Sequence, residues 1–160
     1  MVINNKNKTI RITQLRYIAV IVFLPLIVLL VASEIVKTSF LGLNRFHWAI
    51  ILALVYLGIN IYEHIRNFNY IYVDDSDKKI IFRYISLKPF RSKKYSIEIE
   101  KEKFHSYKII RSFFNLKKEI VLYIETPQGI AKYPPISITA LDGDHMNQLK
   151  HMLNQYALKS

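Results

Sequence analysis

The sequence predicts a membrane-anchored chain: a hairpin of two α-helices followed by one small, mainly β domain that a C-terminal helix closes. Three observations support this prediction. Two stretches of uncharged, largely apolar residues occupy positions 17–33 and 46–62. Apolar and polar residues alternate from position 69 onward, and a helical repeat of apolar residues ends the chain. The apolar excess therefore lies in the first part of the chain, and the rest has the composition of a soluble domain.

The two uncharged stretches have the length of membrane spans. Each covers roughly 25 Å as an α-helix, close to the ~30 Å hydrocarbon core of a bilayer. Aromatic residues that favour the membrane interface stand near their ends, at Tyr17, Trp48 and Tyr62. The segment 18–30 lacks the polar stripe of a helix that packs on a soluble core. We expect residues 17–66 to form a transmembrane hairpin.

Positive charge predicts how this hairpin is oriented. Residues 1–16 carry four Lys and Arg and no acid, whereas the connection between the spans carries only Lys37 and Arg45. Because basic flanks stay on the cytoplasmic side, we interpret residues 1–16 as a basic cytoplasmic tail and residues 38–44 as an outside turn. Both termini are then cytoplasmic.

Several classes of chemistry find no support in the sequence. Cysteine is absent, which excludes disulfides and thiolate metal sites. No phosphate-binding glycine loop, zinc-protease motif or nucleophile elbow occurs. The alternating carboxylates Glu98, Glu100 and Glu102 are interpreted as a solvated strand face. We therefore expect no enzymatic activity, no catalytic residues, no metal and no cofactor.

The net charge of +11 suits either nucleic acid or the anionic inner face of a membrane. Because two spans are present, the lipid bilayer is the expected partner and nucleic acid is not.

The second part of the chain reads as a series of short antiparallel strands. The alternation places them at 70–73, 79–87, 95–99, 104–113, 119–125 and 130–133. The acidic run 74–77 is a turn, and residues 126–129 form a tight turn with proline in its second position. We expect residues 67–160 to form one domain.

The end of the chain is predicted to be one amphipathic helix. Asp142 is a suitable N-cap residue. Four apolar residues recur at helical spacing after it: Met146, Leu149, Leu153 and Tyr156. Such a face needs a surface to cover, so we expect the helix to close one end of the bent sheet or barrel.

This order of elements resembles the small bacterial membrane proteins that carry a pleckstrin-homology-like (PH-like) domain. The local sequence that carries the resemblance is Tyr70–Val73, Lys79–Phe82, Ser96–Ile99 and the run Ile136–Leu141 before the closing helix. The resemblance covers about residues 17–157. It implies a split barrel capped by the helix, a place in the bacterial cytoplasmic (inner) membrane, and often a role in assembling or localising other proteins. Lipid-binding members carry cations in the first hairpin, where residues 74–79 here hold three acids.

Two sets of residues are candidates for contacts. In the loop 88–94, four cations surround one aromatic: Lys88, Phe90, Arg91, Lys93 and Lys94. This composition suits a loop that rests on an anionic leaflet with its aromatic ring dipping in, and a solvated loop is the plain alternative. In the second span, Ala49 and Ala53 form a pair of small residues that lets helices pack closely.

The sequence therefore predicts a non-enzymatic membrane-anchored adaptor or accessory subunit. It would present a PH-like domain at the cytoplasmic face of the membrane to a membrane or cytoplasmic protein partner. Two alternatives remain open. One is a module that senses anionic lipid head groups through the basic loop. The other is a small pore or transport accessory built from oligomerised hairpins, with Ala49 and Ala53 at the interface.

Overall fold

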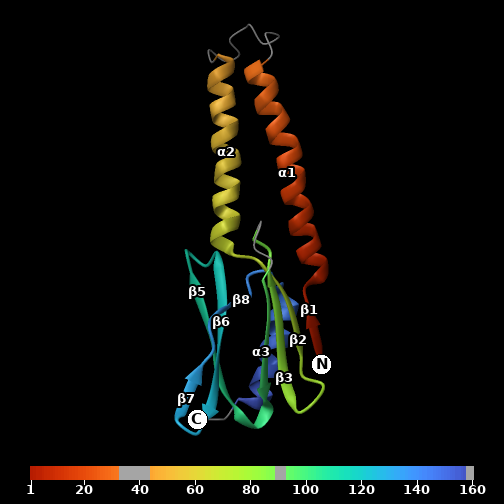
Figure 1. The fold of residues 1–160 in the computed structure, drawn as a ribbon, viewed down its shortest axis with the longest axis vertical. Coiled ribbons are helices and arrows are strands. Elements are labelled where there is room, and N and C mark those ends of the chain that lie inside the picture. Colours follow the sequence, from red (N-terminus) through yellow and green to blue (C-terminus); the bar gives the residue numbers. More distant parts are fainter. Residues whose placement is uncertain (33–43, 89–92, 158–160) are drawn as a thin grey trace. The chain divides into compact units, whose positions relative to one another are not determined.

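The computed structural model describes residues 1–32, 44–88 and 93–157 of this chain (Figure 1). It divides into two compact units. A helical unit comprises Arg11–Glu63, and a β unit comprises Met1–Ile10 together with His64–Ser160.

The helical unit consists of the antiparallel helices α1 (Lys6–Ala32) and α2 (Arg45–Arg66), of which α1 begins inside the β unit. The ring centroids of Phe23 and Tyr56 lie 5.7 Å apart. The Arg16 guanidinium donates to the Glu63 carboxylate at 2.7 Å. Both helices are long and apolar enough to cross a membrane. The two predicted helices are thereby confirmed.

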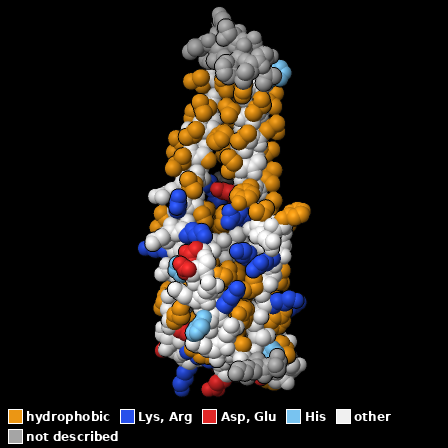
Figure 2. Space-filling view, turned by 180° about the vertical axis from the view of Figure 1, so that it is seen from behind, with side chains coloured by type: hydrophobic (Ala, Val, Ile, Leu, Met, Phe, Trp, Pro, Cys, Tyr) orange, Lys and Arg blue, Asp and Glu red, His pale blue; other side chains and the backbone are white. Residues whose placement is uncertain are grey.

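The surface of these helices is mostly apolar between their charged ends. In the most apolar window of α1 no residue is buried, and in that of α2 only 6% are. Figure 2 shows hydrophobic side chains covering the helices, whereas Lys and Arg gather over the β unit. Soluble monomers rarely expose so large an apolar surface.

The β unit contains two antiparallel sheets. The first has the strand order β1–β2–β3–β4, and the second has the order β5–β6–β7 with β8 also paired to β6. The strands are β1 (Val2–Asn4), β2 (Asn69–Asp74), β3 (Lys79–Ser86), β4 (Lys94–Glu100), β5 (Phe104–Ser112), β6 (Lys117–Thr126), β7 (Gly129–Lys132) and β8 (Ile136–Ser137). The short 3-10 helix Lys101–Lys103 joins the sheets. All six predicted strands are found, while β1 and β8 were not predicted.

The first residues of the chain depart from the predicted tail. Val2–Asn4 pairs with β2, and Ile3 is fully buried in the core. Asn5, only 3% exposed, donates from its side chain to the Asn69 carbonyl at 3.0 Å. Its amide oxygen accepts from the Ile71 N–H at 2.8 Å. The β domain thus includes residues that precede the first helix, because a buried edge of β2 needs these partners.

The helix α3 (Gly143–Tyr156) closes the β unit as predicted. The Asp142 carboxylate accepts from the His145 backbone N–H at 2.9 Å, which confirms the predicted N-cap. Leu149 and Leu153 are fully buried in a core that both sheets share. The helix contacts β5 and β1, so it covers the gap between two edge strands.

The two ends of the β unit differ. At one end, which we call the helix-connected end, the chain passes from Arg66 through two residues into Asn69. The Leu87 N–H bonds the Phe68 carbonyl there at 3.0 Å. The far end holds the turn between β2 and β3.

The acidic turn at the far end is not simply a solvated loop. Asp75 is only 8% exposed. Its carboxylate accepts from the Tyr156 hydroxyl at 3.2 Å and from the Met1 amino group. Its carbonyl accepts from the Lys101 ammonium at 2.6 Å. One of the three acids therefore ties the turn to α3 and to the start of β1.

Candidate functional site

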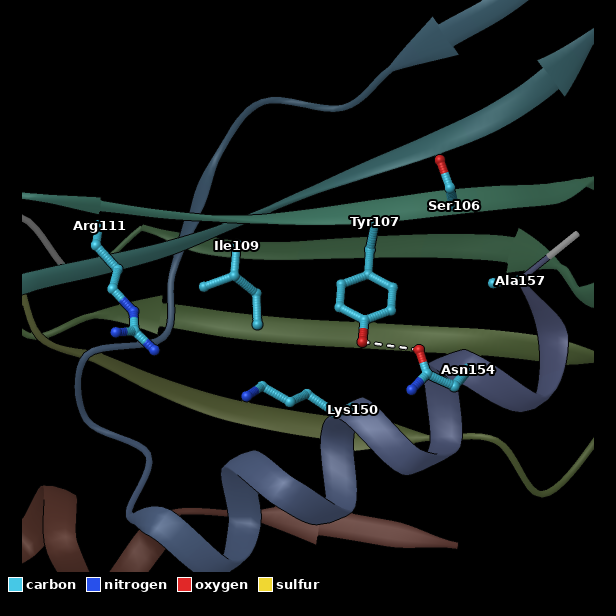
Figure 3. A pocket seen from close by; sticks show the side chains of 7 residues that line it. All are labelled: Ser106, Tyr107, Ile109, Arg111, Lys150, Asn154 and Ala157. Carbon is cyan, nitrogen blue, oxygen red and sulfur yellow. Dashed lines mark hydrogen bonds between the residues drawn. The ribbon is translucent and has the colours of Figure 1, made fainter. Parts of the chain in front are cut away.

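A groove of about 700 Å³ lies in the β unit between β5 and α3 (Figure 3). It is lined by Ser106, Tyr107, Ile109 and Arg111 from β5 and by Lys150, Asn154 and Ala157 from the end of α3 and beyond. All these residues belong to the β unit. We call this hollow the β5–α3 groove.

The spacing of these residues explains why they share the groove. Tyr107, Ile109 and Arg111 alternate along β5, so they project from the same face of the strand. Lys150 and Asn154 lie four positions apart on α3, one helical turn, and so they project from the same side. In Figure 3 the two rows face each other, while Ser106 points away.

A hydrogen bond divides the groove. The Tyr107 hydroxyl donates to the Asn154 side-chain oxygen at 2.9 Å. Burial raises the pKa of the Tyr107 phenol, so the hydroxyl stays protonated at neutral pH. The pair offers a neutral donor and acceptor in the middle of the groove.

The electrostatic character of the groove comes from two cations. Arg111 and Lys150 both lie on the same side of the Tyr107–Asn154 bond, with Ile109 between them (Figure 3). Neither has an acidic partner among the residues that the structure describes. An anionic group placed beside the apolar Ile109 side chain would therefore meet two unpaired positive charges.

The backbone of β5 adds a further binding element. Within the described chain, β5 pairs with β6 and with no other strand. The groove thus combines a strand edge that no second described strand occupies, the apolar Ile109 side chain and two positive charges, a combination suited to an extended acidic peptide segment.

The structure separates the predicted leaflet-contact residues. Lys88 and Lys93 line a cleft of about 420 Å³ together with Asn67 and Pro135. Lys94 instead lines a different hollow on the face of β2–β4. Phe90 and Arg91 lie outside the described residues. Leaflet contact by this loop therefore stays a prediction.

The predicted helix-packing pair shows two environments. Ala49 is only 7% exposed, whereas Ala53 is exposed on α2. Packing of both residues in one interface between hairpins stays a prediction.

The acidic face of β4 carries ordinary ion pairs. Glu98 bonds the Lys79 ammonium at 3.1 Å, and Glu100 bonds Lys103 at 2.6 Å. No group of three or more potential metal-ligating side chains exists in the described part of the chain.

The groove itself was not predicted from the sequence. The alternation of residues 107, 109 and 111 was recognised as a strand, and residues 150 and 154 as part of a helix. The two rows are about forty positions apart in the sequence. They come together only through the packing of α3 on β5, for which the sequence holds no local signal. No protein-family model, no curated protein and no solved structure matches this chain.

Proposed function

We propose that this chain is a non-enzymatic membrane adaptor. In this proposal α1 and α2 form a transmembrane hairpin in a bacterial inner membrane, and the β unit is a PH-like domain on the cytoplasmic side. Two antiparallel sheets closed by one C-terminal helix support the PH-like assignment. The apolar surfaces of α1 and α2 support the anchor.

The pairing of β1 with β2 supports the hairpin topology independently of charge. Asn5 precedes α1 and Asn69 follows α2, yet the two residues are hydrogen-bonded in one domain. In this proposal the chain therefore enters and leaves the membrane on the same side. The basic residues before Tyr17 favour the cytoplasmic side.

The absence of cysteine gives a direct test of this topology. Single cysteines are placed at Ser39 in the connection and at Gln128 in the turn after β6, and intact cells are treated with a membrane-impermeant maleimide. We expect labelling of the Ser39→Cys chain only. Labelling of the Gln128→Cys chain in intact cells would place the β unit outside.

The observation that carries the adaptor proposal is the β5–α3 groove. Its unpaired cations Arg111 and Lys150, its apolar Ile109 and the edge of β5 suit a segment of a protein partner. Positive charge, hydrogen-bonding groups and an apolar side chain in one groove are features of a binding site, so binding is the function that we propose for it.

The test is affinity capture of partners with the full-length chain from native membranes. The double change Arg111→Glu and Lys150→Glu should remove partners held by the groove, because both attractive charges are inverted. Lys78→Glu with Lys132→Glu makes the same net charge change at exposed positions away from the groove and serves as the matched control. An identical set of captured proteins with both double variants would contradict the proposal.

Anionic-lipid sensing is a second candidate, favoured by the cleft that holds Lys88 and Lys93. The Tyr84 and Tyr95 rings also line this cleft and stack there with centroids 5.0 Å apart. The chain reconstituted in anionic and neutral vesicles tests it. Anionic lipid should protect the cleft that holds Lys88 and Lys93 from proteolysis. Loss of this protection in the double variant Lys88→Gln/Lys93→Gln would support lipid sensing. Protection that does not depend on lipid charge contradicts it.

A further inference from the structure

The turn between β5 and β6 exposes two adjacent phenylalanines. The side chain of Phe114 is 100% exposed, and that of Phe113 is 58% exposed. No loop of the described β unit places a larger apolar side chain so fully in solvent. Water is an unfavourable environment for two neighbouring aromatic rings, so this surface calls for an apolar partner.

The backbone of this turn is also unfavourable for its sequence. The Leu116 N–H donates to the Phe113 carbonyl at 3.0 Å, which closes a four-residue turn. The φ angles of Phe113, Phe114 and Asn115 are 50°, 53° and 68°. Hairpin turns with positive φ favour Asn and Gly at their centre, and phenylalanine is disfavoured there. The chain thus holds aromatic rings at a position where local stability favours small or polar residues.

Hydrogen bonds within the β unit show at which end this turn lies. Glu119, close after the turn, pairs with Ser137 of β8. The Ser137 carbonyl accepts from the Asn69 side chain at 3.3 Å. Asn69 is three residues beyond the end of α2, a reach of roughly 11 Å at most. The Phe113–Phe114 turn therefore belongs to the helix-connected end.

The charge around the turn suits a lipid surface. From Phe104 to Lys118 the chain contains Lys108, Arg111, Lys117 and Lys118 and no acidic residue. Lys117 pairs with Glu119 at 2.8 Å, and the remaining positive charges flank the aromatic tip. Aromatic residues framed by Lys and Arg are the composition of segments that enter the interface of anionic membranes.

We propose that the Phe113–Phe114 turn inserts into the interfacial layer of the anionic leaflet and forms a membrane contact of the β unit separate from the two helices. This inference rests on the membrane anchoring in the proposed function. It differs from the predicted loop 88–94, which belongs to another hairpin. Two helix connections together with this aromatic contact would fix the orientation of the domain on the membrane.

The experiment uses the full chain reconstituted in anionic vesicles, with brominated lipids as fluorescence quenchers. The chain has a single tryptophan, Trp48 in α2, which is a natural reporter of the anchor. In a Trp48→Phe background, Phe114→Trp places the reporter at the turn. Ile130→Trp places it at another exposed apolar position, 60% exposed, which pairs with Glu125 near the opposite end of β6. That control lies roughly 30 Å along the strand from the turn.

We expect lipid quenching and a blue-shifted emission for Trp at 114, and quenching by aqueous iodide without lipid quenching for Trp at 130. Equal iodide quenching and no lipid quenching at both positions, with Trp48 of the unmodified chain still quenched by lipid, would overturn the turn contact and leave the anchor intact. Loss of lipid quenching at Trp48 itself would overturn both the anchor and the turn contact.

Discussion

The two units of this chain are specified in different ways. In the helical unit, hydrophobicity is spread over the whole surface, and the described contacts between α1 and α2 include one ion pair and one tilted aromatic pair. In the β unit, apolar residues alternate with polar ones, and individual side chains such as Ile3, Asn5 and Leu149 each fill a particular buried place. A lipid environment would stabilise the first unit through its composition, whereas the second depends on named contacts.

This difference teaches where single substitutions should matter. Exchange of one exposed apolar residue for another in α1 should change the stability of the helical unit in a lipid environment very little. Removal of one buried group in the β unit leaves a cavity or an unpaired polar atom. The following predictions test this contrast from the largest expected effect to the smallest.

The largest effect is expected for Leu149→Ala in α3. Leu149 is fully buried, and its truncation should lower the free energy of unfolding of the β unit by about 2–4 kcal/mol. Urea denaturation of the detergent-solubilised chain, followed by near-UV circular dichroism, measures this loss. The control is Ile21→Ala in α1, where the side chain is 69% exposed and no comparable loss is expected. An equal loss of unfolding free energy in both variants would contradict the difference between the two units.

A smaller loss is expected for Asn5→Ala. The change leaves the buried Asn69 carbonyl and Ile71 N–H without their partner, which should lower stability by about 1–3 kcal/mol. Asn4→Ala is the matched control, because Asn4 is exposed and its side-chain oxygen accepts from the nearby Lys6 N–H at 3.3 Å. Hydrogen exchange at the Ile71 N–H that is no faster in Asn5→Ala than in Asn4→Ala would contradict the stabilising role of the Asn5 side chain.

The N-cap of α3 gives a prediction that depends on pH. The His145 backbone N–H that bonds the Asp142 carboxylate lowers the pKa of Asp142 below its ordinary value of 3.8. Since the folded-state pKa is depressed, the stabilisation is complete well above 3.8 and is lost as the pH falls through the folded-state value. Asp142→Ala should destabilise by about 1 kcal/mol at pH 7 and by less in acid.

Asp142→Asn is the control for this prediction, because asparagine is as good an N-cap and does not titrate. Its stability at pH 7 should be close to that of the unchanged chain, without the loss in acid that Asp142 contributes. Thermal unfolding at several pH values measures both variants. A deficit in Asp142→Ala that grows on acidification would contradict the sign.

The smallest effect has the opposite sign. Phe114→Asn should stabilise the β unit by about 0.5–1 kcal/mol in detergent, because asparagine adopts positive φ more readily and the Phe114 ring packs on nothing in the described chain. Phe114→Leu keeps an apolar side chain but lacks asparagine's preference for positive φ, so it should not increase the stability of the β unit. Destabilisation by Phe114→Asn would show that the ring supports the fold.

Much of the fold follows from local sequence patterns. Alternation located the six longer strands, and the spacing of Leu149 and Leu153 located α3. The strand β1 was missed because three residues before a basic helix carry too short a pattern, and only pairing with β2 reveals their role. The burial of Asp75 was missed for a similar reason, since its partners Tyr156 and Met1 are remote in sequence.

The candidate sites were less accessible to sequence reasoning. The β5–α3 groove joins residues from two distant elements. The Phe113–Phe114 turn carries residues that turn statistics disfavour, so the sequence was interpreted as a continuing strand up to Phe113. Conflicts between local preference and observed structure of this kind concentrate at functional positions.

The pairing of β1 with β2 also orders events during synthesis. Asn5 bonds a residue 66 positions later, and both hydrophobic helices lie between them. A nascent chain therefore carries β1 as an unpaired strand until α1 and α2 have been made and Asn69–Asp74 has emerged from the ribosome. Its shortness and the following Lys6 and Lys8 make it a poor template for aggregation during this interval. Closure of the first sheet would thus occur only in chains in which both helices have already been synthesised, so that a folded β unit is itself a record of their completion.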